Sequence, residues 1–391
     1  MQKQTIFIAL ISMMTFFSAC DKNAIDPDNG DIPIEKDKRY IHFDAGISTR
    51  GIKEGSTLQE NFAVIGYQYL NSWANENILA APNVFLNGNN VILPQQVTYS
   101  STTGLFSYTP LQPWTSNNYS FFAYYPYANS NVKIFDGNGA KQGQPYITYT
   151  IPSTSSNANK DPDTMIDVMT ASVIDTDVSN STVGLHMLHR LSAVDISIRN
   201  YYEYTVSNKP RQVTIELSSL TIKLTRMNTS AKIYLDPSKP TEPTTSTGST
   251  NSPVRTYTMI GTGNYTYLNA LDVPYNQDAK VAIKQKDGDS LPLLLIPQSE
   301  SDTGYLQGRI EMDYKMSYID DRGRKQYVTK RSGWFGQQTD QFENDFNFSF
   351  DRKLEEGRRY EIVLTFASGA VAIQVDPIAD WDSKDVEHEF I

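Results

Sequence analysis

The sequence contains one cysteine, Cys20, and its position limits the chemistry that this thiol can do. A single cysteine cannot form a disulfide within the chain, and a free thiol in an exported protein would be a reactive liability. Cys20 follows the small residues Ser18 and Ala19 and the apolar run TIFIALISMMTFF, which is too short and too N-terminal for a stable membrane span. Small residues fit the narrow site of lipoprotein signal peptidase, which cuts directly before the cysteine that carries the acyl chains. We therefore predict a signal peptide over residues 1–19 and lipidation of Cys20; the alternative is an ordinary secretory signal with an incidental cysteine.

Other residue types that catalyse reactions or bind metals form no recognisable group in the sequence. The four histidines are scattered: His42, His186, His189 and His388. His186 and His189 lie three apart in an apolar run, so a strand would place them on opposite faces, and we expect structural roles for both.

The acidic stretch DPDTMIDVM offers Asp161, Asp163 and Asp167 as oxygen ligands. It lacks the glycine and the closing glutamate of an EF-hand calcium loop, so a loop without metal is the better interpretation. No G-x-S-x-G nucleophile motif is present, and a glycosidase carboxylate pair stays open because such a pair meets only in the fold. We predict no catalytic residue, no metal and no cofactor.

Charge and length restrict the class of protein further. The formal net charge is −10, and Lys and Arg form no cluster that could neutralise phosphates, which argues against a nucleic-acid partner. Residues 20–39 are polar and contain Pro27, Gly30 and Pro33, as expected of a flexible tether. The remaining length favours two domains, which we place at residues 40–180 and 181–391, with the boundary among the turn residues 175–183.

Nearly every apolar run alternates with period two, the spacing of a strand with one buried face. In YIHFDAGI, the apolar side is Ile41, Phe43, Ala45 and Ile47, and Tyr40, His42 and Asp44 take the other side. Hairpins are predicted around Asn87-Gly88 and between QVTYS and LFSYTP, and NYSFFAYYPY predicts an aromatic strand that ends at Pro126. Residues 237–253 are rich in Pro, Ser and Thr and predict a mobile excursion between two strands. The pattern predicts an all-β protein of antiparallel sandwiches.

The stretch GLFSYTPLQPWTSNNYSFFAYYPY, residues 104–127, joins a glycine-aromatic strand, Trp114 and an aromatic strand that ends in Ala-Tyr-Tyr-Pro. With DVMTA (167–171), GLHMLHRLSAVDISI (184–198), YEIVLTF (360–366) and the closing Asp380-Trp381, it resembles the fimbrillin (Mfa-like) family of Bacteroidetes lipoproteins. The resemblance spans nearly the whole chain and rests on the order of these motifs.

This resemblance implies two transthyretin-like antiparallel β-sandwich domains in tandem. It also implies export as an outer-membrane lipoprotein and assembly with other pilin subunits into a surface fimbrium that contributes to adhesion, with a host or bacterial surface receptor as a further partner. In such pilins a protease cuts after an arginine behind the first strand, that strand leaves, and an extended segment of a neighbouring subunit fills the groove.

Several residues of this chain fit those roles. Arg50 follows the strand Ile41 to Ile47 in a polar, glycine-flanked stretch, so a cut at Arg50-Gly51 would release both the lipid and the strand. Rival cleavage sites are Lys36, Lys38, Arg39 and Lys53, and an anchor subunit would keep its lipid and not be cut there. The tail DSKDVEHEFI is a candidate donor strand, with Val386, His388 and Phe390 on one face.

A different class of function also fits the composition. The chain has 24 tyrosines, which can stack on sugar rings but are also good strand formers, so composition does not choose between these uses. The alternative to a pilus subunit is therefore a surface glycan-binding lipoprotein of a polysaccharide-uptake system. Such a protein would stay monomeric and bind oligosaccharide through exposed Trp or Tyr.

Overall fold

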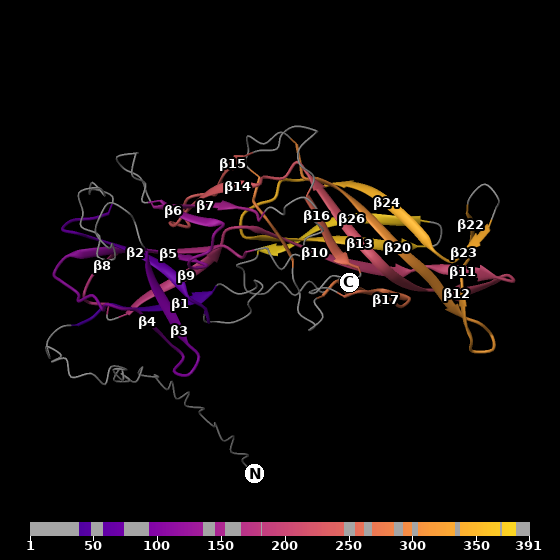
Figure 1. Cartoon of the computed structure of the whole chain (residues 1–391), viewed down its shortest axis with the longest axis horizontal. Coiled ribbons are helices and arrows are strands. Elements are labelled where there is room, and N and C mark those ends of the chain that lie inside the picture. Colours follow the sequence, from indigo (N-terminus) through magenta and orange to yellow (C-terminus); the bar gives the residue numbers. More distant parts are fainter. Residues whose placement is uncertain are drawn as a thin grey trace, which may run out of the picture. The chain divides into compact units, whose positions relative to one another are not determined.

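The regular elements of the computed structural model are β-strands (Figure 1). The structure describes residues 39–47, 58–73, 94–135, 145–152, 166–180, 182–245, 255–261, 268–284, 292–298, 304–332, 337–367 and 370–380. Within these ranges no helix is long and apolar enough to cross a membrane. The all-β prediction is confirmed.

The first sheet has seven strands and gathers most of the N-terminal half of the described chain. In spatial order its strands are β1 (His42–Ile47), β9 (Thr182–His189), β8 (Met169–Thr176), β5 (Asn118–Tyr125), β2 (Phe62–Tyr69), β3 (Gln95–Ser100) and β4 (Leu105–Ser107). The strands β1 and β4, at opposite ends of this order, also approach each other, so the sheet curls around one of its faces. The predicted hairpin of QVTYS with LFSYTP is confirmed as β3 and β4, and the hairpin predicted at Asn87-Gly88 lies outside the described residues.

Both faces of the central strands β2 and β5 of this curled sheet are buried. Its inner face encloses a separate apolar cluster, which we call the inner cluster: Ile41, Phe43, Ala45, Ile47, Leu58, Phe62, Val64, Val97, Tyr108, Trp114, Tyr119, Phe121, Ala123, Met169, Ala171, Val183, Leu185 and Met187. The other face of β2 and β5 contributes Ala63, Ile65 and Phe122 to the larger core shared with the C-terminal strands. Because β2 and β5 have core on both sides, they are buried almost continuously, whereas β1 alternates between buried and exposed.

The C-terminal strands form the other sheets. One five-stranded sheet consists of β18 (Asn276–Ala282), β10 (Ser192–Tyr201), β25 (Arg358–Ala367) and β26 (Ala370–Asp380), with β19 (Leu293–Leu295) also on β10. A six-stranded sheet consists of β16 (Arg255–Ile260), β13 (Thr214–Thr225), β20 (Gln307–Ile319) and β21 (Lys325–Tyr327), with β17 (Leu271–Val273) on β13 and β24 (Phe342–Ser349) on β20. Two small ribbons pair β11 (Glu203–Val206) with β12 (Lys209–Gln212) and β22 (Lys330–Ser332) with β23 (Gln337–Thr339).

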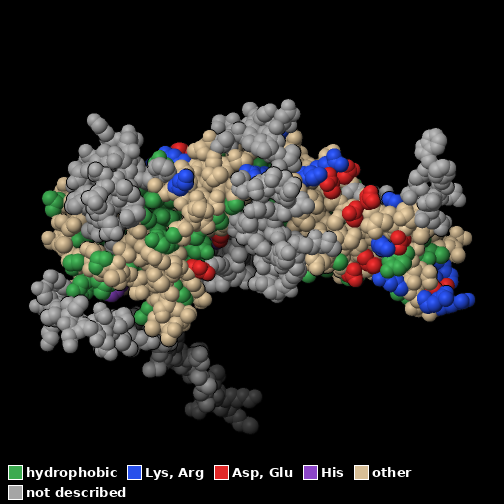
Figure 2. Space-filling model, in the orientation of Figure 1, with side chains coloured by type: hydrophobic (Ala, Val, Ile, Leu, Met, Phe, Trp, Pro, Cys, Tyr) green, Lys and Arg blue, Asp and Glu red, His purple; other side chains and the backbone are tan. Residues whose placement is uncertain are grey.

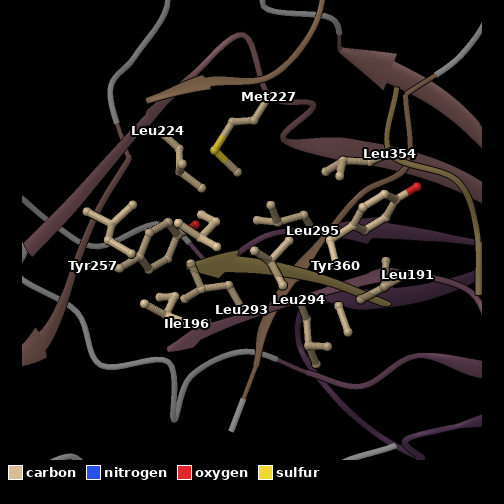
Figure 3. Packing of buried hydrophobic residues seen from close by; sticks show 14 of the residues in the cluster. Leu191, Ile196, Leu224, Met227, Tyr257, Leu293, Leu294, Leu295, Leu354 and Tyr360 are labelled. Atoms are coloured by element: carbon tan, nitrogen blue, oxygen red, sulfur yellow. The ribbon is translucent and has the colours of Figure 1, made fainter. Parts of the chain in front are cut away.

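The centre of the larger core is a run of three leucines on β19. Leu293, Leu294 and Leu295 are all buried, because this short strand has apolar neighbours on both faces. Figure 3 shows the three side chains surrounded by residues from distant parts of the chain, among them Leu224, Met227 and Tyr257. Packing of this kind, at about 0.8 kcal/mol for each buried methylene, stabilises a chain that has no disulfide.

A four-stranded sheet joins the two halves of the sequence. Its order is β15 (Glu242–Thr245), β14 (Ser230–Tyr234), β7 (Tyr146–Thr150) and β6 (Val132–Phe135). The prediction of a mobile excursion over residues 237–253 is wrong for residues 242–245, which form the strand β15, while residues 246–253 lie outside the described residues. Pro243 lies in β15 at the edge of the sheet, opposite Ala231, a position where a missing N–H is tolerated.

The predicted domain boundary at 180/181 separates β8 from β9, two strands that pair with each other. Residues 39–391 group into one compact unit, so this boundary stays a prediction. The pairing of β7 with β14 likewise joins a strand from each predicted domain.

The predicted antiparallel pairing holds for most ladders, but two are parallel: β1 with β9, and β10 with β25. Parallel neighbours need long crossover connections, and both pairs are far apart in the sequence. Alternation within a strand carries no information about such a partner.

The outer face of the six-stranded sheet is charged. Lys223 on β13 lies 2.7 Å from Glu311 on β20, and Arg309 pairs with both Glu311 and Asp345. Figure 2 shows acidic and basic side chains interspersed over the region of β20 and β24. This face therefore offers mixed charge rather than an apolar surface.

Candidate functional site

The first strand, β1, places its apolar side in the inner cluster. Ile41 and Ala45 are fully buried, and Phe43 and Ile47 are each 5% exposed, whereas His42 and Asp44 are exposed. This alternation is the one that period two predicts for YIHFDAGI.

The strand β1 pairs in parallel with β9, from His42 opposite Thr182 to Ile47 opposite Met187. The strand β9 alternates in the same sense and buries Val183, Leu185 and Met187. The apolar sides of the two strands therefore lie next to each other and form one wall of the inner cluster.

Phe43 is the largest side chain that β1 contributes. Its ring lies 5.3 Å from Phe121 in an edge-to-face arrangement and 5.5 Å from Tyr108, measured between centroids. Trp114 packs edge-on against Tyr119 and Phe121 in the same cluster. Edge-to-face aromatic pairs contribute about 0.5–1.5 kcal/mol beyond their buried area, so Phe43 is the main packing anchor of the strand.

The start of β1 is held by the connection between β4 and β5. The Ile41 N–H donates to the Gln112 carbonyl and the Trp114 N–H donates to the Arg39 carbonyl, each at 2.9 Å. The Tyr108 hydroxyl donates to the Ile41 carbonyl at 2.9 Å. Burial raises the pKa of Tyr108 to about 12, which keeps its proton available for this bond.

On the far side of the strand, the Leu58 N–H donates to the Ala45 carbonyl at 2.9 Å. Leu58 is fully buried in the inner cluster, so the segment that follows β1 in the sequence returns to it. His42 lies exposed on the outer side of β1, but its surroundings still remove part of the hydration of its ring, which lowers its pKa below the ordinary value of 6.5.

The structure places only some of the predicted site residues. The first-strand residues Ile41, Phe43, Ala45 and Ile47 come together in the inner cluster. The lipidation residue, the processing site and the candidate donor residues lie outside the described residues: Cys20, Arg50, Gly51, Val386, His388 and Phe390. Of the rival cleavage sites, Arg39 is described, and its carbonyl is bonded at the start of β1.

Of the residues considered for other chemistry, Asp161 and Asp163 lie outside the described residues, and Asp167 pairs with a histidine. His189 is buried, with its Nδ1 3.0 Å from Asp167 Oδ1, and His186 on the same strand is exposed. Within the described ranges, His, Cys, Asp and Glu form no group of three that could hold a metal ion. The two tryptophans in those ranges, Trp73 and Trp114, are each 8% exposed and do not form a surface for stacking sugars.

The residues that hold the start of β1 were not found by sequence reasoning. Tyr108 and Gln112 lie in the stretch that carries the resemblance, but nothing in its pattern distinguishes a tyrosine that bonds another strand from one that fills a core. The nearest signal is Tyr108 directly after the short strand β4, where the alternation stops.

Comparison with known proteins agrees with the fold. A fimbrial protein from Bacteroides vulgatus superimposes with a TM-score of 0.57 at 19% identity, covering 88% of this chain and 99% of that one, which shows a shared fold. Candidate cell adhesion proteins from Bacteroides uniformis and Bacteroides ovatus, each 14% identical, align over 89% of this chain and 99% of theirs with TM-scores of 0.44 and 0.45. Scores below 0.5 do not by themselves define a common fold.

Sequence comparison assigns the family. A search of curated proteins found no significant match to this chain. The model of the fimbrillin-like family matches residues 78–381, which include the aromatic strand β5, the strand β9 and the strands of the C-terminal sheets from β10 to β26. The chain belongs to the fimbrillin-like family.

Proposed function

We propose that the protein is a non-enzymatic fimbrial subunit, exported as an outer-membrane lipoprotein anchored at Cys20 and assembled at the cell surface by exchange of its first strand. Its partners would be other pilin subunits, the membrane before processing, and a surface receptor during adhesion. Family membership and the fold shared with a fimbrial protein support the general role. The position of β1 supports the exchange mechanism.

The observation that carries the proposal is the apolar side of β1 inside the curled sheet. Burial of each Ile or Phe side chain stabilises the folded state by about 1.5–3 kcal/mol. Ile41, Phe43 and Ile47 therefore keep β1 docked while it is part of the chain. Departure of β1 would uncover the β9 edge and the apolar wall beside it. An extended strand from another subunit would satisfy both, through main-chain bonds and alternating apolar side chains.

Proteolysis would make this exchange possible. A cut at Arg50-Gly51 would separate β1 from the rest of the chain. A tethered strand that opens rebinds at once because it stays close by, whereas a cleaved strand can diffuse away. The tail with Val386, His388 and Phe390 is our candidate for the incoming strand, since it can present three side chains on one face.

The test is the N-terminus of the mature protein, determined by mass spectrometry on sheared surface material and on the membrane fraction separately. We expect Gly51 at the start of high-mass sheared material, and loss of that material in Arg50→Ala. Normal filaments in Arg50→Ala would exclude this cleavage site. An acylated Cys20 start found only in membranes would instead indicate an anchor subunit or the glycan-binding alternative.

The lipid anchor is tested independently. Cys20→Ala should abolish acyl labelling and membrane retention of the precursor, because the sulfur that carries the acyl chains is absent. Unchanged labelling of this variant would exclude lipidation at Cys20.

A further inference from the structure

The two ends of β1 are held differently. At its start, residues Tyr108–Trp114, which we call the clasp, make three bonds: to the Ile41 N–H, to the Ile41 carbonyl and to the Arg39 carbonyl. Toward its end, the bond from Leu58 N–H to the Ala45 carbonyl is the one main-chain bond outside the β9 ladder that the described residues contain.

The clasp is itself ordered around Tyr108. The Gln112 N–H donates to the Tyr108 hydroxyl at 3.2 Å, and the same hydroxyl donates to the Ile41 carbonyl. The tyrosine ring is 6% exposed and packs on Phe43. A single side chain therefore connects the fold of the clasp to the backbone and to the main packing anchor of β1.

Opening β1 from its start requires breaking the three clasp bonds and separating Phe43 from Tyr108 at an early stage. Opening from Ile47 requires loss of the Leu58 bond, and either route also breaks the nearest part of the β9 ladder. Since three bonds outside the β9 ladder hold the start of β1 and one holds its end, opening from the Ile47 end has the smaller first step.

We propose that the clasp fixes the direction of strand exchange, so that β1 leaves from its Ile47 end and the clasp opens last. This inference rests on the proposed exchange function and specifies its order. Tyr108 contacts a main-chain carbonyl, which every residue has, so the clasp can hold an incoming strand of any sequence at the same place. Tyr108 would therefore position first β1 and then the incoming strand.

The test is hydrogen exchange on the purified intact chain, read at three amides by mass spectrometry with residue-level fragmentation. The amides of Ile41 and Trp114 report the clasp, and the amide of Leu58 reports the other end. In the unsubstituted protein we expect Leu58 to exchange before Ile41 and Trp114. Simultaneous exchange of all three, or exchange of Ile41 first, would overturn the proposal, and neither result depends on a variant that must fold.

A substitution then isolates the hydroxyl. Tyr108→Phe keeps the ring on Phe43 and removes two bonds of the hydroxyl, the one to the Ile41 carbonyl and the one from the Gln112 N–H. Hydrogen exchange at Ile41 and Trp114 should therefore accelerate about fivefold or more while Leu58 changes little. The matched control is Tyr99→Phe on β3, whose ring packs on Phe106 of β4. Equal acceleration at all three amides in Tyr108→Phe would mean a general loss of stability and would contradict a directional clasp.

These outcomes separate the clasp from the proposed function. If Leu58 exchanges its amide hydrogen before Ile41 and Trp114 but the processed protein forms no filaments, the proposed assembly by strand exchange is wrong. The clasp is then only a structural feature of the monomer. If filaments form while Tyr108→Phe leaves Ile41 exchange unchanged, the proposed function stands and the clasp fails.

Discussion

Arg190 is a fully buried charge that connects three segments far apart in the sequence. Its Nε lies 2.7 Å from Glu356 Oε1, and its two terminal nitrogens donate to Thr170 Oγ1 and to the Lys239 carbonyl. The second oxygen of Glu356 accepts from the Thr241 N–H at 2.8 Å. Burial raises the pKa of Glu356 and outweighs the attraction of Arg190, so the pair is sensitive to the loss of either partner.

Arg190→Met should lower the free energy of unfolding by about 3–5 kcal/mol, because Glu356 would remain as an unpaired, largely buried carboxylate. Denaturant unfolding measures this change. Arg190→Met combined with Glu356→Gln should recover part of the loss, and Arg352→Met, which breaks an exposed pair with Asp351, should have no measurable effect. Equal free energies of unfolding for Arg190→Met and the parent would show that the Arg190–Glu356 pair does not stabilise the fold.

His42 gives β1 a dependence on pH. In the docked strand its pKa lies below 6.5, and on a released strand in water it returns to about 6.5. As the pH falls below 6.5, the released strand therefore binds a proton more readily than the docked one, and acid favours release; above 6.5 this contribution to docking is fully present.

After proteolytic cleavage in vitro, the fraction of β1 released should be larger at pH 5 than at pH 7.5, as measured by size-exclusion chromatography. His42→Gln should reduce this difference. A pH dependence of the same size in His42→Gln would assign the effect to other groups.

At the scale of elements, β20 is the central strand of the six-stranded sheet, between β13 and β24. Gly308 on β20 allows the ring of Phe348 on β24 to lie across it: a Cβ there would meet Phe348 Cζ at 2.4 Å and the Lys223 carbonyl oxygen at 2.9 Å. The contact with a main-chain oxygen of β13 cannot be relieved by a side-chain rotation. The packing of β13, β20 and β24 thus requires a residue without a side chain at position 308.

Gly308→Ala should therefore lower the free energy of unfolding by about 1–3 kcal/mol through overpacking, measured by denaturant unfolding. Gly184→Ala on β9 is the matched control, because a Cβ at that position meets nothing within 4 Å. If both substitutions have the same effect, the loss at Gly308 is a general cost of alanine in a strand and not a packing clash.

The strand β1 shows which features of the fold the sequence could predict and which it could not. Alternation in YIHFDAGI predicts both the strand β1 and the buried set Ile41, Phe43, Ala45 and Ile47, because period two is a local property. The parallel partner β9 could not be predicted, since pairing across a long crossover depends on the whole topology. The clasp was missed for a related reason: a bond from the Tyr108 hydroxyl to a backbone carbonyl leaves no periodic trace in the sequence.

For the whole molecule, the proposed exchange of β1 depends on how the two apolar clusters are divided. The inner cluster is separate from the larger core, which gathers residues of the other face of β2 and β5 and of the C-terminal strands. Loss of β1 would therefore disturb the smaller cluster while the larger core keeps its packing. This division is what the proposed exchange of β1 requires of a subunit that stays folded.

The most direct test of this claim is a reversible covalent lock on β1. His42 and Thr182 are register partners on β1 and β9, and both are exposed. Because neighbouring strands are about 4.8 Å apart, cysteines at these two positions can form a disulfide. The lock is placed in a Cys20→Ser background to remove the third thiol. A matched lock at Thr98 and Ser107 joins β3 to β4 and leaves β1 free.

The measurement is filament formation after arginine-specific proteolysis, with and without reductant, by electron microscopy and sedimentation. We expect that the oxidised His42→Cys/Thr182→Cys protein stays monomeric, that reduction restores filaments, and that the Thr98→Cys/Ser107→Cys control polymerises in both states. Filaments of the oxidised β1 lock that match the parent would contradict assembly by exchange of β1.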